Sequence, residues 1–237
     1  QLPQLLSKAC ELLEYCRGLT VQELKKLLCC NDGIAALNYE RYRDMVLEHA
    51  VTPALLAFDG IQYQYMAPQL FTEEQFGYVR KRLYILSGFY GVLCPSDAVI
   101  PYRLEMQTKL ETENATDLYH FWNNQLYQAL YCKFEKNSPK ELINLASAEY
   151  SKAVLPYLAK DVHCVTCIFG EFVQGKVKVK ATLAKMARGE MVRFMAENNV
   201  CDPEDIKNFR ALGFRYSKER SDKNKMIFLA RYASFIS

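Results

Sequence analysis

The chain has 237 residues, of which 50% are hydrophobic and 24% are charged. Such a composition supports one folded domain with a large buried core and excludes an intrinsically disordered protein. No apolar run approaches the ~20 residues that a membrane span requires, so we expect no membrane partner. The formal net charge is only +3 at pH 7, so any binding of nucleic acid depends on how the cations cluster.

The compartment is indicated by the first residues and by the cysteines. Gln1 to Ser7 lack the basic and apolar regions of a secretion signal. The nine cysteines are an odd number in a large chain, which indicates free thiols in a reducing cytoplasm. Cys164 and Cys167 form a C-x-x-C pair beside His163, but no second pair follows to complete four ligands. We therefore expect buried strand cysteines there, and we predict neither a metal site nor a cofactor.

The first part of the chain is predicted to be helical. Apolar residues recur every three or four positions from Gln4 to Arg17, which indicates an amphipathic helix. Thr20 and Glu23 form a Thr-x-x-Glu capping box, which predicts a second helix through Leu28. A third helix is expected from Ile34 to Val46.

The middle of the chain mixes both kinds of element. The short apolar run from Ala54 to Phe58 predicts a buried strand, and Thr72 is expected to open another helix. A single aromatic helix is predicted from Asp117 to Tyr131, and it holds the only tryptophan, Trp122.

The last part of the chain alternates strands with one long helix. Strands are expected at Leu142–Ala146, Val162–Phe169, Lys176–Ala181 and Met226–Arg231, with a turn over Gly170–Gln174. The long helix is expected from Thr182 to Asn198. Because helices and strands are mixed without repeats or linkers, we predict the α+β (mixed α/β) class and a single compact domain over residues 1–237.

The predicted long helix carries the sharpest candidate site. Ala187, Met191 and Phe194 share its core face, while Lys185 and Arg188 lie one turn apart on roughly the opposite side. A planar guanidinium beside a lysine point charge suits an anion. Gly189 costs a helix about 0.8–1 kcal/mol relative to alanine, which is reasonable where a group approaches the backbone closely. An ordinary solvated helix face is the alternative.

Three further segments could contribute. Gly88 and Gly91 form a Gly-x-x-Gly hairpin whose N–H groups could hold a phosphate, although the motif alone favours an ordinary tight turn. Arg103 and Glu105 would share a face of an extended segment, as a structural ion pair or as a catalytic couple. Ser147 follows a predicted strand, where α/β folds bind ligands, but it could simply cap the next helix.

Motifs of the common enzyme classes are missing. The sequence contains no Gly-x-Ser-x-Gly, no P-loop and no nicotinamide fingerprint. The three histidines are far apart in sequence. Whether the protein is an enzyme is therefore left open, and a protein without turnover is favoured.

The same segments, taken together and in this order, resemble the YaaA family of peroxide-stress proteins. The resemblance rests on Leu83-x-x-Leu86-Ser87-Gly88-x-Tyr90-Gly91-Val92-Leu93-x-Pro95, Pro101 to Met106, Leu118-Tyr119-x-Phe121-Trp122, Ile143-Asn144-Leu145-Ala146-Ser147-x-Glu149-Tyr150 and Lys185-x-Ala187-Arg188-Gly189-x-Met191-x-Arg193-Phe194.

The resemblance implies a helix-hairpin-helix-like element beside a positively charged cleft. It also implies a cytosolic protein of the hydrogen peroxide response that binds DNA and limits damage from unincorporated iron. We expect the DNA to be duplex, distorted or single-stranded, and we favour a monomer. Seven residues would bind phosphate or nucleic acid: Gly88, Gly91, Arg103, Ser147, Lys185, Arg188 and Arg193. If the cleft holds an enzyme instead, acting on a nucleotide or nucleobase, the catalytic candidates are Glu105, Glu149 and Lys185.

The chain also departs from the family pattern. Members typically begin with a strand leading into Ser-Pro-Ala-Lys-Thr, so we expect this N-terminal strand and loop to be lacking here. Asp59 and Cys94 each stand where the family has a cation. Because affinity for DNA follows the number of phosphates neutralised, these losses leave room for a smaller anionic ligand. Direct iron binding by Cys164, Cys167, His163 or carboxylates is the alternative that we rank last.

Overall fold

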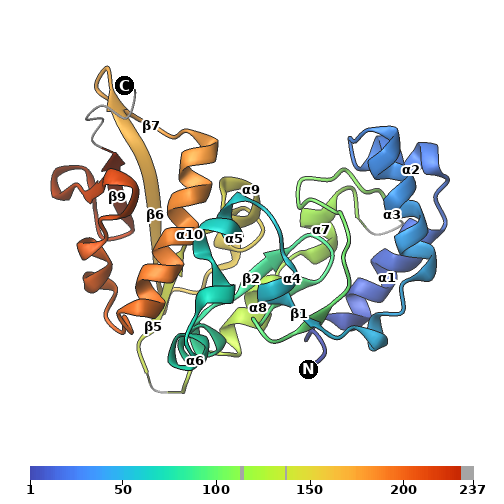
Figure 1. Ribbon diagram of the computed structural model, residues 1–237, viewed down its shortest axis with the longest axis horizontal. Coiled ribbons are helices and arrows are strands. Elements are labelled where there is room, and N and C mark those ends of the chain that lie inside the picture. The colour runs from blue at the N-terminus through green and yellow to red at the C-terminus, as the bar shows by residue number, and fades with distance from the viewer. Residues whose placement is uncertain (113–114, 137, 231–237) are drawn as a thin grey trace. The chain divides into compact units, whose positions relative to one another are not determined.

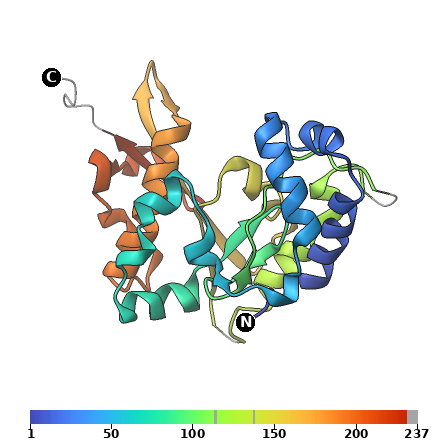
Figure 2. The ribbon, with the colours of Figure 1, turned by 45° about the vertical axis from the view of Figure 1, so that its right-hand side comes forward.

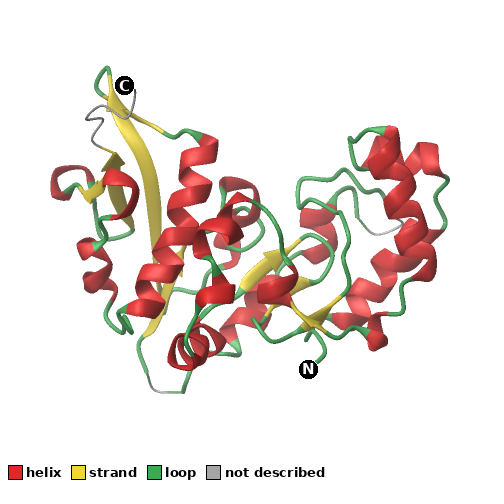
Figure 3. Ribbon diagram, in the orientation of Figure 1, coloured by secondary structure: helices red, strands yellow, loops and turns green. Residues whose placement is uncertain are grey.

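The computed structural model describes residues 1–112, 115–136 and 138–230. Helices and strands are interspersed along this part of the chain, which confirms the α+β class (Figures 1 and 3). The chain divides into two compact units. Unit 1 comprises Gln1–Phe58, Leu83–Glu135 and Ala146–Leu158, and unit 2 comprises Asp59–Arg82, Lys136–Leu145 and the described chain from Ala159 onward.

Unit 1 begins with three helices, as expected. They are α1 (Leu6–Arg17), α2 (Val21–Leu27) and α3 (Asp32–Asp44). The capping box of α2 is formed: the Thr20 hydroxyl accepts from Glu23 N, and Glu23 Oε2 accepts from Thr20 N at 2.8 Å. Helix α3 starts earlier than predicted because the Asn31 side chain accepts from Ile34 N at 2.9 Å and caps it.

The predicted strand at Ala54 to Phe58 is wrong. Residues Ala54–Ala57 form the short helix α4 directly after the two-residue strand β1 (Thr52–Pro53). Ala54 and Leu55 are buried, whereas Leu56 is exposed, which is a helical pattern rather than strand alternation. A five-residue apolar run is too short for its periodicity to distinguish a helix from a strand.

The glycine-containing segment of unit 1 is a β-hairpin. Strand β2 (Ile85–Ser87) pairs antiparallel with β3 (Gly91–Leu93), and β1 pairs with β4 (Ala98–Val99). The turn between Gly88 and Gly91 therefore joins two strands rather than two helices. The helix-hairpin-helix-like element is not confirmed.

The predicted aromatic helix is broken in two. Helix α7 (Leu118–Trp122) is separated from α8 (Gln125–Tyr131) by Asn123, whose φ of 45° ends the first helix. Trp122 is fully buried, and its Nε1 donates to Gly88 O at 2.9 Å. The last short helix of unit 1 is α9 (Ala148–Ser151).

Unit 2 is built on a sheet with strand order β5-β6-β9-β8. Its strands are β5 (Lys140–Asn144), β6 (Val162–Val173), β9 (Lys225–Ala230) and β8 (Phe214–Tyr216). The first three run parallel, and β8 is antiparallel to β9. The predicted last strand is thus confirmed within the described residues, and Arg231, its predicted end, lies outside them.

The predicted turn over Gly170–Gln174 is wrong in position. Strand β6 continues through Gly170 to Val173 and pairs with β7 (Lys176–Lys178). The turn lies at Gln174 and Gly175, whose φ angles of 52° and 77° suit a two-residue hairpin loop. Gly170 instead allows the backbones of β6 and β7 to approach closely, because a Cβ on Gly170 would lie 2.8 Å from Lys178 O.

Three helices complete unit 2. They are α5 (Ile61–Met66), α6 (Glu73–Arg82) and α10 (Ala181–Glu197). Helix α10 follows the long strand β6 in two views, and its apolar face packs on an aromatic core in which Phe169 stacks on Phe228 at 5.2 Å (Figures 1 and 2). Short 3-10 turns occur in both units, at Leu47–His49, Pro68–Leu70, Leu155–Tyr157, Pro203–Asn208, Ala211–Gly213 and Lys218–Arg220.

Candidate functional site

The hairpin of unit 1 uses its own polar groups internally. Gly88 and Gly91 are buried, and the N–H groups of Phe89 and Tyr90 donate to Ser87 Oγ at 3.1 and 2.7 Å. Gly91 has a φ of +78°, in the region that glycine favours. These two glycines are required by the turn and its packing, and phosphate binding at them stays a prediction.

The Arg103–Glu105 segment lies against this hairpin. Arg103 Nη2 is 2.8 Å from Glu105 Oε1, so the expected ion pair is formed, and both side chains are about half exposed. A Cβ on Gly88 would lie 2.4 Å from Leu104 O, which shows how closely the Arg103–Glu105 segment approaches the backbone of the hairpin. The Arg103 Nε is buried and has no hydrogen-bond partner among the described residues.

Glu149 extends this cluster from α9. Its Oε1 accepts from Gln107 N at 3.2 Å, and its carbonyl accepts from the Tyr119 hydroxyl at 3.1 Å. The pKa of Tyr150 is raised, first by burial and then by the negative charges of Glu149 and Glu105. Ser147 occupies the N-cap position of α9, although its side chain makes no capping hydrogen bond. Unit 1 thus brings Gly88, Arg103, Glu105 and Glu149 into neighbouring segments.

Helix α10 of unit 2 carries the other predicted residues. Lys185 is exposed, and Arg188 is partly buried with a pKa lowered by that burial. The Arg188 Nε is buried and has no hydrogen-bond partner among the described residues. Within the same part of the chain, neither Arg188 nor Lys185 has a carboxylate partner. Arg193 differs, because its Nε lies 2.7 Å from Glu197 Oε1. Lys185 and Arg188 are therefore the cations of this helix that have no carboxylate partner among the described residues.

The predicted site residues fall into both units. Gly88, Gly91, Arg103 and Ser147 belong to unit 1, as do Glu105 and Glu149, whereas Lys185, Arg188 and Arg193 belong to unit 2. Each unit orders its own set by contacts within that unit. A single basic cleft lined by both sets is not confirmed and stays a prediction.

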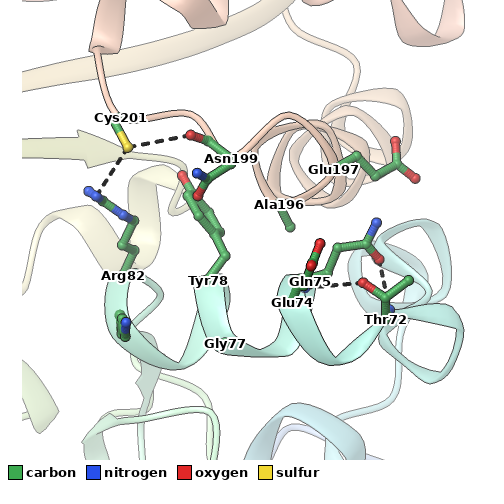
Figure 4. Close-up of a pocket in the computed structure, with 11 residues that line it drawn as sticks. Thr72, Glu74, Gln75, Gly77, Tyr78, Arg82, Ala196, Glu197, Asn199 and Cys201 are labelled. Atoms are coloured by element: carbon green, nitrogen blue, oxygen red, sulfur yellow. Dashed lines mark hydrogen bonds between the residues drawn. The ribbon is translucent and has the colours of Figure 1, made fainter.

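Unit 2 also contains a cavity of about 800 Å³ between α6 and the end of α10 (Figure 4). Arg82 Nη2 donates to Cys201 Sγ at 3.4 Å, and this thiol donates to Asn199 O at 3.4 Å. Tyr78 forms part of the wall, and its hydroxyl donates to Val200 O at 2.8 Å. Burial raises the pKa of Tyr78 to about 12, so its hydroxyl stays protonated.

None of the sequence-predicted residues lines this cavity. Its lining comprises Thr72, Glu74, Gln75, Gly77, Tyr78, Lys81, Arg82, Ala196, Glu197, Asn199 and Cys201. The residues Arg82 and Cys201 are 119 positions apart. No motif spacing links residues so distant, so only the packing of α6 against α10 could reveal their contact.

The Cys164–Cys167 pair lies on the strand β6. Residues three apart on a strand point to opposite faces, which is unsuited to chelating one ion. Burial raises the pKa of Cys164 to about 11 and that of Cys167 to about 12, which keeps both as thiols. Within the described residues, no three His, Cys, Asp or Glu side chains are placed to hold a metal ion together.

The fold is that of an α+β protein. None of the helices in the described ranges is long and apolar enough to cross a membrane. The family model described as peroxide stress protein YaaA matches residues 1–220. The chain therefore belongs to the YaaA family of peroxide stress proteins.

Relatives cover nearly the whole chain. A UPF0246 protein of Desulfitobacterium hafniense is 50% identical over 232 residues, which is 98% of this chain and 90% of that protein. A UPF0246 protein of Pediococcus pentosaceus is 49% identical over 228 residues, covering 96% and 89% of the two chains. A third, of Lactiplantibacillus plantarum, is 43% identical over 230 residues, covering 97% and 91%. The family resemblance drawn from the motifs is confirmed.

Proposed function

We propose that this peroxide stress protein binds DNA in the cytoplasm. The principal contacts are those of Lys185 and Arg188 of α10 with the phosphates of the DNA backbone. The observation that carries the proposal is the Arg188 guanidinium, which is partly buried and keeps an Nε without a partner in the described chain. Bound DNA would be held without turnover, and this binding would limit iron-dependent oxidative damage.

Burial of an arginine without a carboxylate favours an anionic ligand. Burying polar groups without hydrogen bonds costs free energy, typically about 1–3 kcal/mol for each unsatisfied group. A phosphate oxygen supplies both the missing acceptor and the compensating charge, and a guanidinium can hold it with two parallel hydrogen bonds. Lys185 is exposed and lies one turn before Arg188, and its positive charge would attract the same kind of anion.

The proposal is tested by fluorescence anisotropy with duplex, bubble and single-stranded DNA over a salt series. For duplex DNA, the plot of log K against log salt has a slope of about −0.9 for each phosphate neutralised. The Lys185→Ala/Arg188→Ala variant should therefore bind more weakly and lose about 1.8 from the magnitude of that slope.

A matched control removes the same charge elsewhere on unit 2. Lys223 and Lys225 are exposed, and neither has an ion pair within the described residues. The Lys223→Ala/Lys225→Ala variant should keep the parental slope. Binding that is weak in the parent, or equally affected by both variants, would refute a specific phosphate grip on α10.

A second candidate function follows from the cluster in unit 1. The Arg103–Glu105 pair is half exposed, and Glu149 contacts the same loop through Gln107 N. Carboxylates beside an arginine with an unmet Nε also suit an enzyme acting on a nucleotide or nucleobase. Lys185, the third catalytic candidate, belongs to unit 2 and is not part of this cluster.

The two functions predict different results in a thermal-shift screen of nucleotides. An enzyme site should bind a defined nucleotide or nucleobase, and Glu105→Gln or Glu149→Gln should abolish turnover while leaving the fold intact. Stabilisation by DNA alone, unchanged by either glutamate substitution, would favour the binding protein.

A further inference from the structure

The hairpin of β6 and β7 continues beyond the sheet of unit 2. Strand β6 pairs with β9 over Thr166–Gly170, but over Glu171–Val173 its only partner among the described strands is β7. Figure 1 shows this hairpin extending beyond the rest of its sheet, next to the start of α10. Its tip is a surface element that the function proposed for α10 does not use.

One face of the hairpin carries two lysines, whose cross-strand neighbours on that face are Val173 and Glu171. Lys176 and Lys178 are two residues apart on β7, so their side chains emerge on the same face, and both are exposed. Neither has an ion pair within the described residues. Lys180, which follows them, is 2.8 Å from Glu171 Oε1 and is neutralised by it.

The opposite face holds the hairpin in place. Phe172 pairs across the strands with Val177, and the Arg220 guanidinium lies 3.8 Å from the Phe172 ring centroid. Arg220 comes from the 3-10 turn Lys218–Arg220, so this cation–π contact attaches the hairpin to the sheet region. The two lysines are thus presented on a supported strand rather than on a free loop.

The spacing of these lysines suits a nucleic-acid backbone. Residues two apart on an antiparallel strand are separated by about 6.8 Å. Two long lysine side chains on one face can therefore contact separate phosphates of a DNA strand. The chain then passes through Lys180, the N-cap residue of α10, directly to Lys185 and Arg188. Because Lys180 is already paired with Glu171, the lysines of the hairpin and the two cations of the helix form separate sets.

We infer that the β6–β7 hairpin is a second DNA-binding element, which contacts backbone phosphates through Lys176 and Lys178 without reading sequence. This inference rests on the DNA-binding function proposed above. Because Lys185 and Arg188 lie on a separate element, the two sets of contacts should contribute independently to affinity.

The test compares three double variants of the full chain in the same anisotropy assay: the hairpin variant, the Lys185→Ala/Arg188→Ala variant of α10 and a control. Lys176→Ala/Lys178→Ala should lower the magnitude of the duplex salt slope by about 1.8, equivalent to roughly 60-fold weaker binding at 0.1 M salt if affinity at 1 M is unchanged. The loss should be the same for DNA duplexes of unrelated sequence. The control is Lys223→Ala/Lys225→Ala, near the opposite end of β6, where Lys225 pairs with Thr166. Circular dichroism should show all variants folded.

The outcomes separate this inference from the function on which it rests. A parent that does not bind DNA refutes both. A parent that binds and is weakened by the α10 variant, while the hairpin variant matches the control, refutes the hairpin contact alone. A hairpin variant that keeps DNA affinity but loses binding to anionic lipid vesicles would assign these lysines to a membrane surface and also overturn the inference.

Discussion

Replacing Gly189 by alanine should destabilise unit 2, although alanine is the better helix former. Gly189 lies where α10 crosses α5, and a Cβ there would be 2.1 Å from Gln62 O and 2.8 Å from Met66 N. Both atoms belong to the backbone, so no side-chain rotation can relieve the overlap. The two helices would have to move apart by roughly 1 Å to restore ordinary contact distances.

The change in the free energy of unfolding caused by Gly189→Ala is the sum of two opposing contributions. Overpacking of this kind costs about 3 kcal/mol at the upper end of its usual range. The gain in helix propensity returns about 1 kcal/mol. The net destabilisation of about 2 kcal/mol corresponds to a fall in Tm of roughly 4–8 °C for a chain of this size.

Gly77 is the matched control for this substitution. It lies within α6 of the same unit, and a Cβ there would meet no atom within 4 Å. Gly77→Ala should therefore raise Tm by roughly 2–4 °C, because only the propensity term of about 1 kcal/mol acts.

Far-UV circular dichroism is the suitable assay for both variants. The single tryptophan, Trp122, belongs to unit 1, so its fluorescence does not report directly on these two helices. Thermal melts of the parent and both variants give the two Tm shifts. A Gly189→Ala protein as stable as the parent, or a Gly77→Ala protein that is clearly less stable, would refute the reasoning from close helix packing.

Three further results are expected. Gly88→Ala should destabilise unit 1 by about 1–3 kcal/mol, because its Cβ would lie 2.4 Å from Leu104 O, and urea melts followed by Trp122 fluorescence should show a lower midpoint. The N-cap hydrogen bonds of α2 lower the pKa of Glu23 below that of an ordinary glutamate. The stabilisation from this carboxylate is therefore complete above the ordinary pKa and is lost as pH falls through the lowered pKa. Parallel melts should show the advantage over Glu23→Gln shrinking between neutral and acidic pH, whereas a constant difference would contradict this linkage. Brief alkylation followed by mass spectrometry should label exposed Cys201 and spare Cys167, whose burial raises its pKa to about 12; equal labelling would contradict the burial.

The sequence predicted those features whose cause lies within a few residues. The capping box of α2 needs only Thr20 and Glu23, and both of its hydrogen bonds are formed. The apolar stripe of α10 repeats over 17 residues, which is long enough to identify a helix and its buried face. The Arg103–Glu105 pair also formed as expected, because its members are two residues apart.

Short elements were decided by tertiary packing. The run at Ala54 has too few residues to show a period, and its helix is held by Ala54 N donating to Asp97 O at 2.7 Å. The break between α7 and α8 occurs at Asn123, next to the buried Trp122 and its hydrogen bond to Gly88 O. Neither partner can be inferred from local composition, because each is more than thirty residues away in the chain.

The sequence by itself therefore determined the α+β class, the family and the cations of α10. Periodicity and motif order are properties of neighbouring residues, and they survive without knowledge of the fold. The neutralisation of Arg193 by Glu197 is also local, because the two residues are one helical turn apart. Only the tertiary structure decided that the Arg188 Nε is buried without a hydrogen-bond partner among the described residues. It also decided the cavity at Cys201 and the support of the β6–β7 hairpin by Arg220, because burial and pairing depend on segments that meet only when the chain folds.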